Sequence, residues 1–186
     1  MRNPFLVGKR IYLRPLDPED VKRGYLDWIN DRRTNRFLMA GIMPTNEGEL
    51  SGYYEKITCS KNDIMFAIVM KKTDKYIGNI KLGGIDWINR HAHCGRLIGD
   101  SKSRGKGYGT EALKLVIGYA FNTLNLNRVY NSMIIDNMGA MKSCIKAGMK
   151  KEGRFSQYRF LDGRYRDVLQ FAITRSRYER LKKERR

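Results

Sequence analysis

Hydrophobic residues along this chain follow two spacings, one typical of strands and the other typical of helices. Short runs rich in apolar, aromatic and β-branched residues predict strands at residues 10–16, 64–70, 76–82, 92–99, 128–135, 155–161 and 165–174. Between two of these runs lies an apolar stripe with helical spacing, made of Ala112, Leu113, Val116, Ile117, Ala120, Phe121 and Leu124. Residues 92–135 therefore predict a strand, a loop, a helix that packs on a sheet, and a second strand.

Capping signals predict three further helices. The Asp-Pro-Glu-Asp sequence at 17–20 supplies an N-cap, a proline at the first helical position and acidic residues in the first turn. The helix that follows would place on one face the residues Val21, Tyr25, Trp28 and Ile29. A second helix is expected to begin near Thr45, and a third to run from about Asn137 to a C-terminal glycine, Gly148.

A turn signal joins the last two strand-like runs. Asp162-Gly163 between them is typical of a two-residue hairpin turn. Strands outnumber helices and the order of the two is mixed, which predicts an α/β fold with a partly antiparallel sheet. A length of 186 residues suits one domain, expected to span residues 1–186.

The charge of the chain points to an anionic partner. There are 37 Lys and Arg against 19 Asp and Glu, a formal net charge of +18. Such an excess favours nucleic acid, an acidic membrane face or a phosphorylated small molecule, without choosing among them. Part of the excess is terminal, and residues 176–186 are expected to form a solvated basic helix end or tail.

Cysteine usage and hydropathy indicate the compartment. Cys59, Cys94 and Cys144 are odd in number and far apart, which disfavours a disulfide scaffold or structural zinc and favours a reducing environment. No signal peptide is recognised, and no apolar run approaches the ~20 residues of a membrane span. We therefore expect a cytoplasmic protein without membrane attachment.

The glycine-rich stretch at residues 104–111 carries the strongest chemical signal. It reads Arg-Gly-Lys-Gly-Tyr-Gly-Thr-Glu, directly after a predicted strand and at the start of the predicted helix. Backbone N–H groups exposed at the positive end of a helix dipole can bind a phosphate or pyrophosphate. Glycine count alone fits an ordinary strand-to-helix turn equally well.

Spacing excludes the two commonest phosphate-binding motifs. A nucleotide-triphosphate loop needs Ser or Thr directly after its Gly-Lys pair, whereas Lys106 is followed by Gly107. The dinucleotide fingerprint needs Gly-x-Gly-x-x-Gly, whereas the glycines here occupy positions 105, 107 and 109.

Arg104-x-x-Gly107-x-Gly109 matches a third pattern, the Arg/Gln-x-x-Gly-x-Gly/Ala signature of the GNAT acyl-CoA N-acetyltransferases. The chain resembles this superfamily from about residue 11 to residue 168, and its ribosomal-protein and amino-sugar branch in particular. The supporting segments are 11–16, 77–80, 97–100, 136–137, 146–149 and 165–168.

The resemblance implies a GNAT-like mixed sheet flanked by about four helices, with a splayed pair of parallel strands and a C-terminal hairpin. It also implies acetyl-CoA as co-substrate, with its pyrophosphate on the loop amides and its pantetheine arm between the splayed strands. The cofactor-binding residues it implies are Leu97, Ile98, Arg104, Gly105, Lys106, Gly107, Tyr108, Gly109, Thr110 and Asn137. Asn137 is nearly as well explained as the cap of its helix.

Two catalytic positions depart from the family pattern. Many relatives carry a glutamate base where this chain has His93, and a histidine of pKa ~6.5 can serve as a base or simply pack on the sheet. Relatives often have a tyrosine proton donor where this chain has Cys144, a possible acid or a buried apolar residue. Ser143 and water are the other candidate donors. With His91 and His93 as the only histidines, a zinc site is not expected.

The acceptor amine is the least determined part of the function. The resemblance places the acceptor site near Trp28, Asn30 and Arg159, on surfaces rich in arginine. A phosphate-bearing acceptor such as a nucleotide-linked amino sugar suits such a site better than a cationic polyamine. A protein N-terminus on a ribosome also fits, and would be the one route to nucleic acid. A non-catalytic acyl-CoA sensor and a nucleic-acid-binding protein remain open, as do a monomer and a homodimer.

Overall fold

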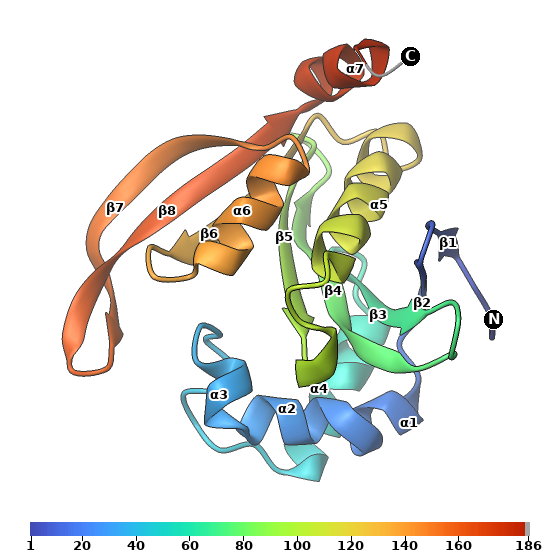
Figure 1. The fold of residues 1–186 in the computed structure, drawn as a ribbon, viewed down its shortest axis with the longest axis vertical. Helices are drawn as coiled ribbons and strands as arrows, with labels where there is room; N and C mark the ends of the chain where they lie inside the picture. Colours follow the sequence, from blue (N-terminus) through green and yellow to red (C-terminus); the bar gives the residue numbers. More distant parts are fainter. Residues whose placement is uncertain (185–186) are drawn as a thin grey trace.

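The centre of the structure is an eight-stranded sheet with the strand order β1-β2-β3-β4-β5-β6-β8-β7 (Figure 1). A computed structural model describes residues 1–184. The strands are β1 (Leu6–Val7), β2 (Ile11–Pro15), β3 (Ile64–Met70), β4 (Tyr76–Asp86), β5 (His91–Ile98), β6 (Arg128–Ile134), β7 (Lys150–Leu161) and β8 (Arg164–Thr174). Every neighbouring pair is antiparallel except β5 and β6, which run parallel. The predicted α/β class and mixed sheet are confirmed.

Helices cover both faces of the sheet. They are α1 (Pro18–Asp20), α2 (Leu26–Asn30), α3 (Arg32–Asn35), α4 (Glu47–Thr58), α5 (Tyr108–Asn122), α6 (Met138–Lys146) and α7 (Arg175–Lys183). The predicted helices near 17, 45, 110 and 137 are present, and short segments raise the number above the four expected. The basic end is a helix from Arg175, and residues 185 and 186 of the expected tail lie outside the described part. Within residues 1–184, no helix combines the length and apolar character needed to cross a membrane.

Two apolar clusters form the core, one on each face. The predicted stripe of α5 is buried against β2 to β6, where Leu113 and Val116 are inaccessible to solvent. On the other face, α2 and α4 bury Ile29 and Leu50 against Tyr12 of β2 and its neighbours. The alternation of strand side chains assigns odd and even positions of β5 to opposite faces. The sheet therefore separates the α5–α6 side from the α1–α4 side.

The first predicted helix is broken, which corrects the sequence-based expectation. Its pieces meet at a π-helical turn, Val21–Tyr25, in which Gly24 has φ +143° and Arg23 has non-helical angles. Glycine adopts such a positive φ without the steric penalty of a side chain. The break redirects α2 so that the Trp28 ring packs on Tyr76, with ring centroids 4.8 Å apart.

The predicted hairpin forms as expected. Asp162 and Gly163 both have positive φ, as a tight turn of this kind requires. Strand β7 is the exposed edge of the sheet, and the tip of the hairpin returns towards α3 (Figure 1). There Arg36 pairs with Asp162 at 2.7 Å, and the Arg159 guanidinium donates to the Phe37 carbonyl at 2.9 Å.

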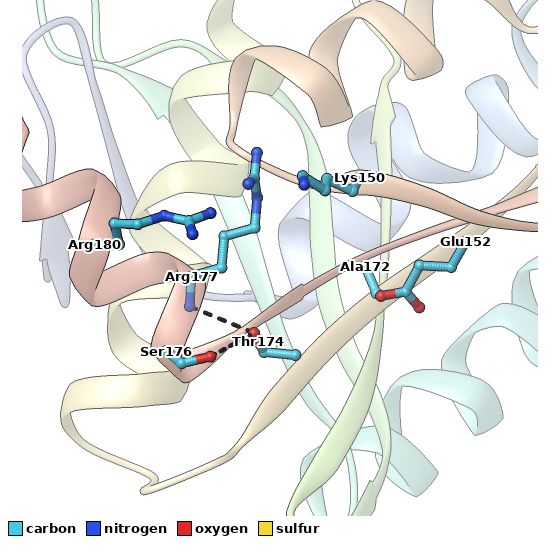
Figure 2. Close-up of a pocket in the computed structure, with 7 residues that line it drawn as sticks. All are labelled: Lys150, Glu152, Ala172, Thr174, Ser176, Arg177 and Arg180. Carbon is cyan, nitrogen blue, oxygen red and sulfur yellow. Dashed lines mark hydrogen bonds between the residues drawn. The ribbon is translucent and has the colours of Figure 1, made fainter.

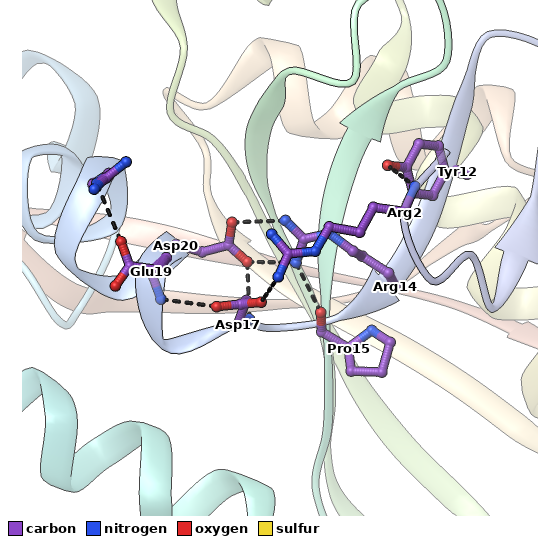
Figure 3. A network of polar contacts seen from close by, with 8 residues as sticks. Arg2, Tyr12, Arg14, Pro15, Asp17, Glu19 and Asp20 are labelled. Atoms are coloured by element: carbon purple, nitrogen blue, oxygen red, sulfur yellow. Dashed lines mark hydrogen bonds and ion pairs between the residues drawn. The ribbon is translucent and has the colours of Figure 1, made fainter.

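A buried ion pair ties the start of α1 to β2 (Figure 3). Arg14 donates to both carboxylate oxygens of Asp20, at 2.5 and 2.8 Å, and the Asp20 carboxylate also accepts the Asp17 backbone N–H. Asp17 in turn caps the helix, which completes a capping box. Hydrogen bonding to Asp20 raises the pKa of Arg14 despite the opposing effect of burial.

We expect Asp20→Ala to lower the free energy of unfolding by about 3 to 5 kcal/mol, because it leaves the Arg14 charge buried and unpaired. Chemical denaturation would measure the loss. Glu19→Ala is the matched control, since Glu19 makes an exposed pair with Arg23 worth at most about 1 kcal/mol. Equal losses in the two variants would contradict the assignment.

Candidate active site

Strands β5 and β6 separate after three residue pairs. The pairs run from His91 with Arg128 to His93 with Tyr130, and beyond Tyr130 the two strands form no further residue pairs. Each strand continues along its other neighbour, β5 on β4 and β6 on β8. The result is a wedge-shaped opening in the sheet, called here the β5–β6 opening. The expected splayed strand pair is therefore present.

The pairing of β5 with β4 decides which amides face this opening. Gly99 donates its N–H to the Ile77 carbonyl at 3.0 Å, so odd-numbered residues of β5 exchange hydrogen bonds with β4. The N–H groups of Arg96 and Ile98 point the other way, towards the opening. Of the two amides expected to polarise a bound carbonyl, that of Ile98 is suitably placed, whereas that of Leu97 faces β4.

The glycine loop begins α5 in the conformation that a phosphate cradle needs. Gly105 and Gly107 have φ of +74° and +85°, and Gly107 is the N-cap residue of α5. No side chain caps this helix, so its first N–H groups remain available to a ligand. A Cβ built at Gly105 meets no atom within 4 Å. This geometry fits a pyrophosphate group, while the exposed side chain of Lys106 adds positive charge beside it.

Arg10, which sequence reasoning missed, clamps this loop. Its guanidinium donates to the Lys106 carbonyl at 2.8 Å and to the Glu111 carboxylate at 3.0 Å, and lies 4.8 Å from the centroid of the Tyr108 ring. Burial alone would raise the pKa of Glu111, but the hydrogen bonds from Arg10 outweigh it and lower that pKa. Arg10 and Glu111 are 101 residues apart, and no spacing signal connects them.

Arg104 is used differently from the expectation that it adds charge for the phosphates. Its guanidinium turns back and donates to the carbonyls of Ile98 and Gly99, both at 2.9 Å. It also donates to the Thr34 hydroxyl of α3 at 2.6 Å. Arg104 thus fastens the end of β5 and the start of the glycine loop to α3.

Two further residues of the implied coenzyme site have partners within the protein. The Thr110 hydroxyl lies 2.9 Å from that of Ser143, so α5 and α6 share a hydrogen bond beside the loop. Asn137 accepts the Ala140 N–H at 3.1 Å and so caps α6, the structural role that its position before the helix predicts. A contact between Asn137 and pantetheine stays a prediction.

His93 lies at the closed end of the β5–β6 opening, on the α1–α4 side of the sheet. Its ring is 5.4 Å from that of Tyr130, the last β6 residue to pair with β5. Burial and the nearby positive charge of Lys81 lower the pKa of His93. The neutral imidazole is therefore its main form at neutral pH, as a base requires.

Cys144 faces the other side of the sheet, from α6. Its side chain is fully buried, and its Sγ lies 3.9 Å from both terminal nitrogens of Arg96. Burial raises the pKa of Cys144, and the Arg96 charge opposes that rise only in part. The group stays a thiol at neutral pH, but it has no exposed surface from which to donate a proton. A role as proton donor stays a prediction.

The three expected acceptor residues gather near α2, α3 and the hairpin tip. The Trp28 ring packs directly on Gly99, where a built Cβ would lie 1.8 Å from it. Asn30 holds the backbone of Thr45 through both ends of its amide, at 2.8 and 3.0 Å. Arg159 is engaged with the Phe37 carbonyl, and burial lowers its pKa. Trp28 and Asn30 thus form the surface called here the Trp28 wall, and the Asn30 amide is engaged with the backbone of Leu26 and Thr45. A contact between this wall and an acceptor stays a prediction.

Cavities and metal-binding groups elsewhere do not compete with this site. A cavity of about 300 Å³ lies between α7 and the start of β7 (Figure 2). Its lining consists of Lys150, Glu152, Ala172, Thr174, Ser176, Arg177 and Arg180, none of which belongs to the predicted site. Among residues 1–184, no group of three or more His, Cys, Asp or Glu is arranged to hold a metal ion.

Comparison with known proteins identifies the family. The model of the acetyltransferase (GNAT) domain family matches residues 10–150, a segment that contains the opening, the glycine loop and both catalytic candidates. The chain belongs to the GNAT acetyltransferase family. It is an N-acetyltransferase that uses acetyl-CoA, which confirms the sequence resemblance at the level of the family.

Relatives of this GNAT enzyme carry different names. It is 34% identical over 174 residues to the uncharacterized N-acetyltransferase p20 of Bacillus licheniformis, a match covering 93% of this chain and 97% of p20. The crystal structure of a Vibrio cholerae spermidine N-acetyltransferase with CoA and spermine has a TM-score of 0.83 at 25% identity, covering 91% of this chain and 98% of that one. The putative ribosomal N-acetyltransferase YdaF of Bacillus subtilis is 26% identical over 181 residues, covering 93% and 96%.

We expect Gly107→Val to weaken acetyl-CoA binding at least tenfold. A valine at φ +85° is strained by about 1 to 2 kcal/mol, and its Cβ would approach a terminal nitrogen of Arg10 to 3.1 Å. Calorimetric titration would measure the dissociation constant. Gly52→Val on α4 is the control, because a Cβ there meets nothing within 4 Å. Unchanged binding in Gly107→Val would place the phosphates elsewhere.

Proposed function

We propose that this GNAT enzyme acetylates the primary amine of a phosphate-bearing acceptor, such as a nucleotide-linked amino sugar, by direct attack in a ternary complex. The observation that carries the proposal is the charge pattern of α3 and the β7–β8 hairpin. Arg32 and Arg33 of α3 and Arg164 of β8 are exposed and have no ion-pair partner among residues 1–184. They leave positive charge beside the Trp28 wall.

The carboxylates of this wall are largely occupied. Asp31 caps α3, where a hydrogen bond from the Thr34 hydroxyl and one from the Arg33 N–H lower its pKa. Asp162 is paired with Arg36, and Asp167 with Arg154. Asp27 of α2 is the exception. A polycationic acceptor therefore meets few free carboxylates, whereas a phosphate meets unpaired arginines.

The chemistry needs a neutral amine and a polarised thioester. An alkylammonium of pKa ~10.4 must lose a proton before it attacks, and neutral His93, at the closed end of the opening, would accept that proton. The N–H groups of Arg96 and Ile98 face the opening and can donate to a carbonyl oxygen as it gains negative charge. Ser143, Cys144 or water would return a proton to the departing thiolate.

The relatives support a second candidate, polyamine acetylation. The Vibrio cholerae protein whose fold matches is named a spermidine N-acetyltransferase, and its structure holds spermine. A protein N-terminus is a third acceptor, by analogy with the putative ribosomal enzyme.

A panel of acceptors separates these possibilities. In a thiol-release assay with acetyl-CoA, we expect kcat/KM to be highest for a nucleotide-linked amino sugar, lower for an N-terminal peptide and lowest for spermidine. Arg33→Glu should lower kcat/KM for the phosphorylated acceptor about fivefold, the effect of losing an exposed charge pair worth up to about 1 kcal/mol. Arg180→Glu on α7 is the control with the same charge change. A preference for spermidine would refute the proposed acceptor.

His93→Gln should lower kcat/KM at neutral pH by about 10² or more, the usual contribution of a general base. In the wild type, kcat/KM should fall only below about pH 6.5, since the pKa of His93 is lower than that ordinary value and its neutral form persists above it. The acid limb of the pH profile should disappear in His93→Gln. His91→Gln on the same strand is the control, and an unaltered limb in His93→Gln would remove His93 as the base.

A further inference from the structure

A buried asparagine stands at the point where β5 and β6 separate. Asn131 follows Tyr130, the last β6 residue paired with β5, and its side chain is almost completely buried. Its Nδ2 donates to the carbonyl of Cys94, the first β5 residue beyond the paired region. The contact is direct and lies at the closed end of the β5–β6 opening.

The register shows what this side chain replaces. Arg128 donates its N–H to the Arg90 carbonyl, so even-numbered residues of β6 face β5. In a continued parallel ladder, the Cys94 carbonyl would accept the N–H of Ser132. The Asn131 amide takes that acceptor instead, and Ser132 keeps an N–H without a strand partner in β5.

If the buried Cys94 carbonyl had no hydrogen-bond donor, further pairing of β5 with β6 would be favoured. A buried carbonyl without a donor costs free energy, and pairing the strands by one more step is the simplest way to satisfy it. The side-chain amide removes this driving force because it supplies the donor while its own volume separates the two backbones. No other side chain among residues 1–184 donates to the Cys94 carbonyl.

We propose that Asn131 is a positioning residue that keeps the β5–β6 opening apart, so that the coenzyme arm meets unpaired backbone groups. The inference rests on the proposed placement of that arm in the opening. Without Asn131, the ladder extends by at least the pair from Ser132 to Cys94. Acetyl-CoA must then break that pair before it binds.

Amide hydrogen exchange and calorimetry test the two halves of this inference. In the wild type without ligand, the Ser132 amide should exchange rapidly. In Asn131→Ala it should become protected, and the dissociation constant for acetyl-CoA should rise about tenfold. Asn131→Ser, which keeps a shorter polar group in the buried position, should change both quantities in the same direction if the alanine variant fails to fold.

Val129→Ala is the matched control. Val129 is a buried residue of the same strand, one position before the last paired residue, so its truncation destabilises the sheet without touching the opening. It should leave Ser132 exchange and coenzyme affinity unchanged. Fast Ser132 exchange and unaltered affinity in both Asn131 variants would overturn the inference. Absence of acetyl-CoA binding by the wild type would instead refute the proposed function.

Discussion

The site depends on one pair of strands that stop pairing. Neighbouring strands normally satisfy each other's backbone groups along their whole length, and here β5 and β6 do so for only three residue pairs. Each strand is held straight by its other neighbour, so the separation leaves a rigid edge of N–H and C=O groups on both sides. The glycine loop, His93 and the Trp28 wall all lie around this one interruption of the sheet.

Long-range arginine contacts keep the surroundings of the opening in place. Arg10 holds the glycine loop from the N-terminal edge of the sheet, and Arg104 holds α3 against the end of β5. Each donates both to the backbone and to one side chain, which is Glu111 for Arg10 and Thr34 for Arg104, so main-chain positions are fixed together with side chains. Some of the arginines of this basic chain therefore hold its segments together. Exposed arginines of α3 and the hairpin remain unpaired among residues 1–184 and could bind an anionic ligand.

Local patterns predicted the fold because each element carries its own signal: the stripe of α5, the capping residues at 17–20 and the turn at Asp162. The details that differ from the sequence-based expectation depend mainly on contacts between segments that lie far apart in the chain. Spacing cannot show that Leu97 directs its amide to β4, since that follows from the register with Ile77. Nor can it show that Arg104 turns towards Thr34, or that Gly24 breaks a helix which the apolar spacing alone makes continuous. Asn131 had no local signal at all, because its importance comes from the strand beside it.

The contact between the hairpin tip and α3 has a dynamic consequence. Arg36 and Asp162 are each more than half exposed, and an exposed pair of this kind contributes at most about 1 kcal/mol, roughly twice the thermal energy. Such a tether breaks and re-forms continually, and salt weakens it further. The hairpin tip is thus held by two contacts of different kinds: the exposed Arg36–Asp162 pair, which salt weakens, and the part-buried hydrogen bond from Arg159 to the Phe37 carbonyl. Salt therefore weakens part of the hold of the hairpin tip on the segment after α3, whereas the apolar core under the sheet contains no charge pair for salt to screen.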